Sequence, residues 1–386
     1  MSKHADNLND PNGWFSIIFV TNNSTMDMGV PIYVDNFRVS LPEGSTPVPS
    51  GNINTAENFP DPNFRQAVEE FMGVGPGGAF TAAEAAAKRE WLYCDELGIT
   101  SMKGIEFFTN IGALHCSGNL ITQLDLSNNT ELTELRCGVN SLTSLDLSNN
   151  PKLELVVCEH NKLTQLNVSN NFALLELYCN GNELTDLDLS NCLELTDLAC
   201  YDNNLTALDV SNNFALETLL CAENSLTMLD VTQNMALSNL SCHTNELAAL
   251  DLLSNSMLIE LYCGDNNLTN LVLWECMDLT ILDCADNALV ALDVSQNTAL
   301  EYLDCNYNEL TSISGLVDNE GLDAGDEVDI THNLLDCDDW NDVLVLRDRI
   351  GEGFTYSPQK NLDPYDCSGQ VPTNTPTSAP QPPTPP

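Results

Sequence analysis

Ten cysteines of this chain recur at intervals of 21 residues without a single insertion or deletion. An asparagine follows each of them three positions later, from Asn119 to Asn308. A fixed period of this length is typical of stacked repeats and constrains the fold more than any local propensity does. The ten are Cys116, Cys137, Cys158, Cys179, Cys200, Cys221, Cys242, Cys263, Cys284 and Cys305.

Apolar residues recur at the same places in every repeat, as in the copy that runs from Leu216 to Asn234. One repeat is too short to bury its own apolar side, whereas stacked copies cover one another as in a solenoid. The pattern Leu-x-x-Leu-x-Cys-x-x-Asn-x-Leu matches the leucine-rich repeat, whose strand runs through the first part of the unit. We therefore predict an α/β solenoid in which parallel strands, about 4.8 Å apart, line the concave face.

Residues 60–367 resemble the internalin-type leucine-rich repeat proteins of bacteria, in the cysteine-ladder subtype. The matching stretches are Leu114-His-Cys116-Ser-Gly-Asn119, the recurring Leu-Asp-Leu-Ser-Asn-Asn, the entry segment Ile99–Ile111 and the exit segment Tyr356–Lys360. The resemblance implies extracellular recognition by a non-enzymatic scaffold, often in adhesion.

The ladder cysteines project in parallel toward the interior of such a solenoid. Their Cβ atoms would stand near the strand spacing, whereas a disulfide needs about 3.8 Å and a suitable torsion. We interpret them as buried free thiols that act as small apolar residues; a row of metal thiolates is the alternative. Cys94, 22 residues before Cys116, is expected to start the same ladder.

Four cysteines lie outside the ladder. Cys337 and Cys367 flank the segment after the last repeat, and we predict a disulfide between them that closes a C-terminal cap in an oxidising compartment. Cys192 and Cys276 lie four repeats apart, about 19 Å, and are too distant to bond to each other. Tolerated substitution and intermolecular pairing both remain open for them. They replace an asparagine found at the same place in other repeats, namely Asn129, Asn150, Asn171, Asn213, Asn234, Asn255 and Asn297.

The chain is strongly acidic, with 12 Lys and Arg against 57 Asp and Glu. No Lys or Arg occurs between Lys162 and Arg347, so nucleic acid and anionic lipid are disfavoured as partners. Partners should be cationic, neutral or bridged by a divalent cation. We expect no membrane insertion, because the longest apolar stretch near the start is Phe15–Val20. Met1–Asp6 does not open a signal peptide, so we expect either an upstream export signal or an expressed segment of a longer protein.

Six regions are predicted along the chain. Phe15–Val20 and Pro31–Val39 are similar to the closing strands of jelly-roll carbohydrate-binding modules, so residues 1–41 are interpreted as a fragment of a β-sandwich. Residues 42–58 form a linker rich in Pro, Gly and small polar residues. A helical N-terminal cap follows at 59–90, the solenoid at 91–336 and the C-terminal cap at 337–369. Residues 370–386 are a Thr/Pro-rich disordered linker.

The N-terminal cap is predicted to hold two helices. Asp61 and Pro62 begin the first, with Phe64 and Phe71 on its buried face, and Thr81-Ala-Ala-Glu84 is a capping box that opens the second. The segment Gly73–Glu84 between them has the length of a calcium loop, but glycines stand where the first, third and fifth positions need carboxylates. It is either an emptied relic of such a site or a chance match.

Two polar residues recur inside each repeat. The asparagine after each cysteine is expected to point inward and to bond the backbone of its own turn and of the next coil. The aspartate of Leu-Asp-Leu alternates with buried residues and should face solvent, with weak divalent-cation binding as the alternative. It occurs as Asp125, Asp146, Asp188, Asp209, Asp230, Asp251 and Asp293.

Function in a solenoid is expected where the repeat varies. Residues that flank the cysteines project to the concave wall, and tyrosines with acidic neighbours suit protein or glycan recognition. Ordinary surface variation is the alternative explanation. The predicted binding residues are Arg136, Tyr178, Tyr201, His243, Tyr262, Asp283, Tyr302, Asp304 and Tyr307. Leu253 and Trp274 replace the usual Ser or Thr in two adjacent repeats. They are interpreted either as a second contact patch or as local packing within the loops.

The sequence thus favours a recognition or adhesion module, with a structural spacer between domains as the alternative. We expect no enzymatic activity, cofactor or metal centre, because the chain has five scattered histidines, no nucleophile motif and no phosphate loop.

Overall fold

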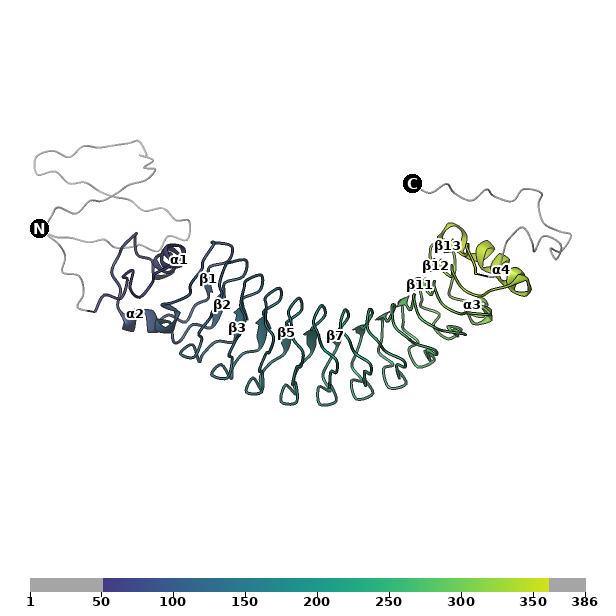
Figure 1. Cartoon of the computed structure of the whole chain (residues 1–386), viewed down its shortest axis with the longest axis horizontal. Helices are drawn as coiled ribbons and strands as arrows, with labels where there is room; N and C mark the ends of the chain where they lie inside the picture. The colour runs from purple at the N-terminus through teal and green to yellow at the C-terminus, as the bar shows by residue number, and fades with distance from the viewer. Residues whose placement is uncertain (1–50, 361–386) are drawn as a thin grey trace, which may run out of the picture. The chain divides into compact units, whose positions relative to one another are not determined.

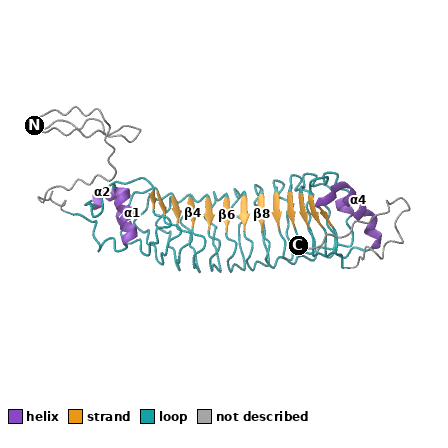
Figure 2. Ribbon diagram, turned by 90° about the horizontal axis from the view of Figure 1, so that it is seen from above, coloured by secondary structure: helices purple, strands orange, loops and turns teal. Residues whose placement is uncertain are grey.

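The computed structural model of the protein describes residues 51–360. A single parallel sheet of 13 strands, in sequential order, runs through this region and lines the inner side of a curved stack of coils (Figures 1 and 2). Neighbouring strands pair one repeat apart, as Leu135 does with Val156 and Val156 with Leu177. The predicted leucine-rich repeat solenoid is confirmed. Its strands are β1 (Leu92–Tyr93), β2 (Ala113–His115), β3 (Glu134–Arg136), β4 (Leu155–Val157), β5 (Glu176–Tyr178), β6 (Asp197–Ala199), β7 (Thr218–Leu220), β8 (Asn239–Ser241), β9 (Glu260–Tyr262), β10 (Ile281–Asp283), β11 (Tyr302–Asp304), β12 (Glu327–Asp329) and β13 (Phe354–Thr355).

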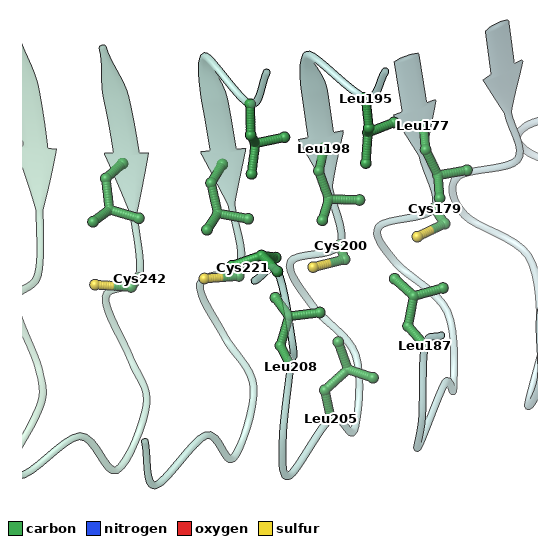
Figure 3. Packing of buried hydrophobic residues seen from close by; sticks show 14 of the residues in the cluster. Leu177, Cys179, Leu187, Leu195, Leu198, Cys200, Leu205, Leu208, Cys221 and Cys242 are labelled. Atoms are coloured by element: carbon green, nitrogen blue, oxygen red, sulfur yellow. The ribbon is translucent and has the colours of Figure 1, made fainter. Parts of the chain in front are cut away.

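The ladder cysteines point into the interior directly after each strand. Figure 3 shows the sulfur atoms of Cys179, Cys200, Cys221 and Cys242 in parallel, below the buried leucines of the strands. All eleven, including Cys94, are buried free thiols, which confirms their interpretation as packing residues and Cys94 as the first of the row. Burial raises the pKa of Cys242 to about 12.

Each strand is short because the backbone turns sharply two residues after the cysteine. The residue at that place has a positive φ in coil after coil, for example 52° at Val139 and 50° at His160. The N–H of Val139 still donates to the carbonyl of Glu159 in the next coil at 2.8 Å. The turn therefore ends the strand without ending the hydrogen bonding between coils.

The ladder asparagines fill the turn as predicted, with one difference in direction. Asn182 donates from Nδ2 to the carbonyl oxygen of Cys179 in its own coil and to that of Cys158, at 3.0 and 3.1 Å. Its Oδ1 accepts from the N–H of Leu163 at 3.0 Å. The coil that each asparagine reaches is the preceding one, not the following one.

The two extra cysteines of the repeats are also interior residues. Cys192 and Cys276 are fully buried free thiols, and the Sγ of Cys276 lies 3.6 Å from the carbonyl oxygen of Asn255. Intermolecular pairing through either residue is therefore wrong, because a bond to another molecule needs an accessible sulfur atom. Burial raises the pKa of Cys192 to about 11.

Two further coils follow the last ladder cysteine. Asp304 pairs with Asp329 in a longer coil that contains α3 (Ser314–Val317), and Asp329 pairs with Thr355. Ile330 occupies the position that a cysteine holds in the regular coils. Its carbonyl oxygen accepts hydrogen bonds from Nδ2 of Asn333 at 3.0 Å and from Nε2 of Gln359 at 2.6 Å. The sheet thus continues into the region predicted to be only a cap.

The N-terminal cap covers the first coil with α1 (Pro62–Met72) and α2 (Ala82–Ala86), and a 3-10 turn, η1 (Ile105–Phe107), follows β1. Asp61 caps α1 and its other carboxylate oxygen accepts from the N–H and hydroxyl of Thr100, both at 2.7 Å. The cap begins earlier than the predicted boundary at residue 59. Asn54 is buried and donates to Glu69 at 2.8 Å and to the carbonyl of Gly78 at 2.7 Å.

The loop with calcium-loop length is organised by hydrogen bonds from the protein itself. Oε1 of Glu69 accepts from the N–H of Gly77 at 2.9 Å. Glu84, the twelfth position, accepts from the N–H and the hydroxyl of Thr81 at 2.7 and 3.0 Å and so caps α2.

The C-terminal cap consists of η2 (Cys337–Asp339), α4 (Trp340–Ile350), η3 (Gly351–Gly353) and β13. Val343, Leu346 and Ile350 bury one face of α4. Cys337 is disulfide-bonded. Cys367 lies outside the described residues, as do the predicted β-sandwich fragment and the Thr/Pro-rich linker, so the pairing of Cys337 with Cys367 stays a prediction. Between residues 51 and 360 no helix has the length and hydrophobicity needed to cross a bilayer.

Candidate binding surface

The concave wall is built from the first and third residues of the three-residue strands. In β3, β5, β9, β10 and β11 these residues are half-buried on either side of a fully buried central residue. Alternation along a strand directs them away from the core. The wall therefore presents two side chains per coil at fixed spacing.

Most of the predicted binding residues lie on this wall. Arg136, Tyr178, Tyr262, Asp283 and Asp304 end their strands, and Tyr302 begins β11. Tyr201 and His243 are half-exposed one residue after their ladder cysteines.

Tyr307 lies beyond the end of its strand instead of on it. It occupies the turn position with φ 49°, and its ring stacks on that of His332 with centroids 4.0 Å apart and an angle of 7° between the planes. We predicted that Tyr307 would lie on the same wall as Tyr302. This prediction did not allow for the turn, in which a residue with positive φ no longer follows the in-and-out alternation of side chains along the strand.

Three carboxylates stand side by side at the C-terminal end of the wall. Asp283, Asp304 and Asp329 are register partners on β10, β11 and β12. Nδ2 of Asn306 donates to both Asp304 and Asp329, at 3.2 Å each. Burial, and then the charges of Asp329 and Asp283, raise the pKa of Asp304 to about 6.

An open pocket of about 300 Å³ is lined by two of these carboxylates, Asp304 and Asp329. Tyr302 and Asp304 form one side of it, and Glu327, Asp329 and Glu352 contribute from β12 and η3. Burial raises the pKa of Tyr302, and Asp304 and Asp283 add to the effect. The sequence analysis did not assign Glu327, Asp329 or Glu352 to the binding surface. Val328 occupies the position of the central leucine in β12, and recognising this would have placed its neighbours Glu327 and Asp329 on the wall.

The tyrosines of the central wall are held by glutamates at the start of the same strands. The hydroxyl of Tyr178 donates to Oε2 of Glu176 at 3.1 Å, and burial together with that carboxylate raises the pKa of Tyr178 to about 12. Tyr262 has a raised pKa from burial and then from Glu260 and Asp283. These rings are fixed with their hydroxyl groups beside acceptors.

The N-terminal end of the wall differs in chemistry. Oε1 of Glu134 lies 3.0 Å from Nε2 of His115 and 2.6 Å from Nε of Arg136. The rings of Trp91 and Tyr93, both about half exposed, lie 5.7 and 4.8 Å from the imidazole of His115. Sequence reasoning missed both aromatic residues, because they precede the first regular repeat.

Comparison with known proteins places the chain in a family. No family model and no curated protein matches the sequence. Among solved structures, the chain is similar to the functional domain of InlJ from Listeria monocytogenes, which includes a cysteine ladder. The two are 30% identical over 79% of this chain and 80% of that chain, with a TM-score of 0.58. The chain belongs to the internalin-type leucine-rich repeat proteins with a cysteine ladder.

A second internalin shares the fold of this internalin-type chain. Internalin InlF from Listeria monocytogenes superposes with a TM-score of 0.70 over 78% of this chain and 92% of that chain, at 22% identity. Membership in the family and this fold support a module of the protein-binding or adhesion type.

In the chain described here, the predicted second patch lies in the loops and not on the concave wall. Leu253 and Trp274 are 47% and 60% exposed. The N–H of Leu253 donates to Oδ1 of Asp251 at 3.1 Å, as the serine at this position does in other coils.

The aspartates of Leu-Asp-Leu are exposed, as predicted, and have a local structural role. Oδ1 of Asp125 accepts from the N–H of Ser127 at 3.0 Å, and hydrogen bonds from Ser127 lower its pKa. Between residues 51 and 360 no group of three or more His, Cys, Asp or Glu is arranged to hold a metal ion.

Proposed function

We propose that this internalin-type chain is a non-enzymatic recognition module that binds a protein or glycan through its concave wall, outside the cell or at the cell surface, as part of a larger exported protein. The observation that carries the proposal is the cluster at the C-terminal end of the wall. Tyr262, Asp283, Tyr302 and Asp304 come from three consecutive strands, and Tyr302 and Asp304 line the 300 Å³ pocket.

The chemistry of this cluster suits a partner with cationic or hydrogen-bonding groups. Tyrosine supplies apolar area with a polar tip at little cost in side-chain entropy, and such residues are enriched at recognition surfaces. The neighbouring carboxylates accept hydrogen bonds from amines, guanidinium groups or sugar hydroxyls. The same carboxylates repel phosphate, which argues against nucleic acid.

A structural spacer is the second candidate function. The regularity of the coils favours it, because ten ladder cysteines keep one spacing without insertion, so the solenoid holds its two ends at a set separation.

Protein and glycan arrays probed with the full chain would distinguish the two functions. We expect capture by a defined set of ligands and its loss in the Tyr262→Ala/Tyr302→Ala variant. Tyr93→Ala, a tyrosine at the opposite end of the same sheet, is the matched control and should retain capture. Absence of any ligand, or capture that the double substitution leaves unchanged, would contradict binding at this cluster and favour the spacer.

A further inference from the structure

A cavity of about 580 Å³ lies along α1 in the N-terminal cap. Its lining comes from the segment 56–60, from one face of α1 between Pro62 and Glu70, and from the loop 74–77. Every lining residue among the described ones precedes the first strand of the sheet. Pockets that hold small ligands have volumes of about 300 to 1,000 Å³. We call this feature the cap cavity.

A buried carboxylate with one unused oxygen lines the cap cavity. The side chain of Glu69 is only 10% exposed, and its Oε1 accepts from Nδ2 of Asn54 at 2.8 Å and from the N–H of Gly77 at 2.9 Å. No group within residues 51–360 donates to Oε2, although this atom is not enclosed by the protein. Buried carboxylate oxygens normally accept hydrogen bonds. Oε2 is therefore an acceptor that Glu69 offers to a molecule in the cavity.

The charge of the cap cavity is negative on balance. Its described lining residues include two carboxylates, those of Glu69 and Glu70, and one guanidinium, that of Arg65. Nε of Arg65 donates to Oδ1 of Asn54 at 2.7 Å and lies 3.3 Å from Oε1 of Glu69, so this cation is held at the oxygen that is already in use. Nε2 of Gln66 donates to Oε1 of Glu70 at 3.1 Å. A ligand that enters the cavity therefore meets an excess of acceptors and of negative charge.

The remaining walls of the cap cavity are apolar and stiff. Pro60, Pro62 and Pro76 line it together with Val74, and the fully buried ring of Phe59 lies beneath them. The ring of proline fixes its backbone, so these walls are formed before a ligand arrives. Such surfaces suit a chain of methylene groups, as in lysine and arginine, whose stems pack on apolar atoms while the charged end reaches a polar group.

We propose that the cap cavity binds an alkyl chain that ends in a cation. The ammonium or guanidinium group donates to Oε2 of Glu69, and the methylene groups lie against the proline and valine walls. The net charge of −45 attracts such a ligand from a distance. A basic side chain of a partner polypeptide and a free polyamine share this chemistry. The site lies in the cap, so the proposal is independent of the function proposed for the concave wall.

Calorimetric titration of the full chain with defined probes tests the proposal. The probes are the methylamides of Nα-acetyl-L-lysine and Nα-acetyl-L-arginine, the diamine 1,5-diaminopentane, and the neutral methylamide of Nα-acetyl-L-norleucine. We expect saturable binding of cationic probes, about tenfold or more tighter than that of the neutral probe, because a hydrogen bond to a charged group is lost in the latter. Binding should weaken from ~0.05 M to ~0.5 M NaCl. Tighter binding of the amino-acid amides would identify a polypeptide side chain as the ligand, and tighter binding of the diamine a polyamine.

Two substitutions assign the binding to the cap cavity. Glu69→Gln removes the charge at the unused oxygen and should weaken binding of the lysine probe by about tenfold or more. Because Glu69 also holds Asn54 and Gly77, a second variant leaves that network intact. Gln66→Lys changes an exposed residue of α1 to another good helix former and places a cation at the mouth of the cavity. It should weaken binding to a similar extent while the circular dichroism spectrum stays unchanged.

Glu57→Gln is the matched control. Glu57 is an exposed carboxylate of the same cap that does not line the cavity, so its substitution should leave the affinity unchanged. Binding should also persist in the Tyr262→Ala/Tyr302→Ala variant, and its loss there would place the probe on the concave wall and overturn the proposal. The same conclusion would follow if no cationic probe bound, if the norleucine probe bound equally well, or if neither Glu69→Gln nor Gln66→Lys reduced binding.

Discussion

The side-chain nitrogen of Asn161 lies 3.1 Å from the carbonyl oxygen of Cys137 in the preceding coil. The same amide donates to the carbonyl of Cys158 at 3.1 Å and accepts from the N–H of Leu142 at 2.9 Å. One side chain thus closes the turn after its own strand and joins two coils. Because the other ladder asparagines repeat this arrangement, they connect the coils on the side where the sheet ends.

Substitution Asn161→Ala should lower the free energy of unfolding by about 2 to 4 kcal/mol, because it leaves buried carbonyl and N–H groups without partners. Urea denaturation would measure the loss, and hydrogen exchange would show it concentrated in the coils around residues 137–163. Asn212→Ala, at an exposed asparagine of another loop, is the control and should change stability little. Equal effects of the two substitutions would contradict the role of the ladder.

Stability should fall steeply at alkaline pH. Burial raises the pKa of the ladder thiols above their ordinary value of 9.0, to about 12 for Cys242. The folded protein therefore keeps protons that the unfolded chain releases above pH 9, so stability is full below that pH and is lost as pH rises toward 12. Each such thiol contributes about 1.4 kcal/mol per pH unit in this range. Urea midpoints measured at pH 8, 9 and 10 should fall in that order, and equal midpoints would show that the thiols are not protected.

Val139 offers a test of the strained turn. It is 52% exposed and has a φ of 52°, a conformation that costs a β-branched residue about 1 to 2 kcal/mol. Val139→Asn should raise the free energy of unfolding by about 0.5 to 1 kcal/mol, because asparagine tolerates this region better. Val290→Asn is the matched control, since Val290 is 53% exposed and is not among the residues with positive φ. A thermal melt in which both variants behave alike would argue against the strain.

Asp304 should destabilise the fold at neutral pH. Its pKa is raised from 3.8 to about 6 because the folded protein favours the protonated carboxyl group. The contribution of this group to the free energy of unfolding is therefore fully present below pH 3.8 and is lost as pH rises through 6. Asp304→Asn should therefore stabilise the protein at pH 7 by about 1 kcal/mol, after allowance for solvent screening, and have little effect near pH 3.5. Urea titrations at the two pH values would measure the difference. Glu301→Gln, at an exposed carboxylate of the same coil, should show no such pH dependence.

Prediction from sequence succeeded where the period decides the structure. Once coils stack every 21 residues, Cys179 must lie beside Cys200, and the asparagine after each must meet the same backbone groups. The helices of the N-terminal cap were also predictable, because Asp61 and Thr81 are local capping signals. The periodic argument failed at the C-terminal end of the ladder, where Ile330 and Gln359 replace the expected residue types, and at Tyr307, where a turn overrides the alternation.

The candidate site could be predicted only in part. The sequence variation beside the cysteines predicted Tyr262, Tyr302 and Asp304 as binding residues. It did not predict the pocket that Tyr302 and Asp304 form together with Glu352. Trp91 lies before the repeats begin, so no period assigned it to the wall.

The sequence by itself determined the architecture, the burial of the thiols and the inward asparagines, because a repeat that buries one side of each coil admits a single way of stacking. Only the tertiary structure decided which variable side chains meet. The pairing of Asp304 with Asp329 crosses a coil of different length, and the contact of His115 with Glu134 joins two coils. A constant period sets which backbones are neighbours, whereas side-chain contacts and solvent exposure arise from the packing between them.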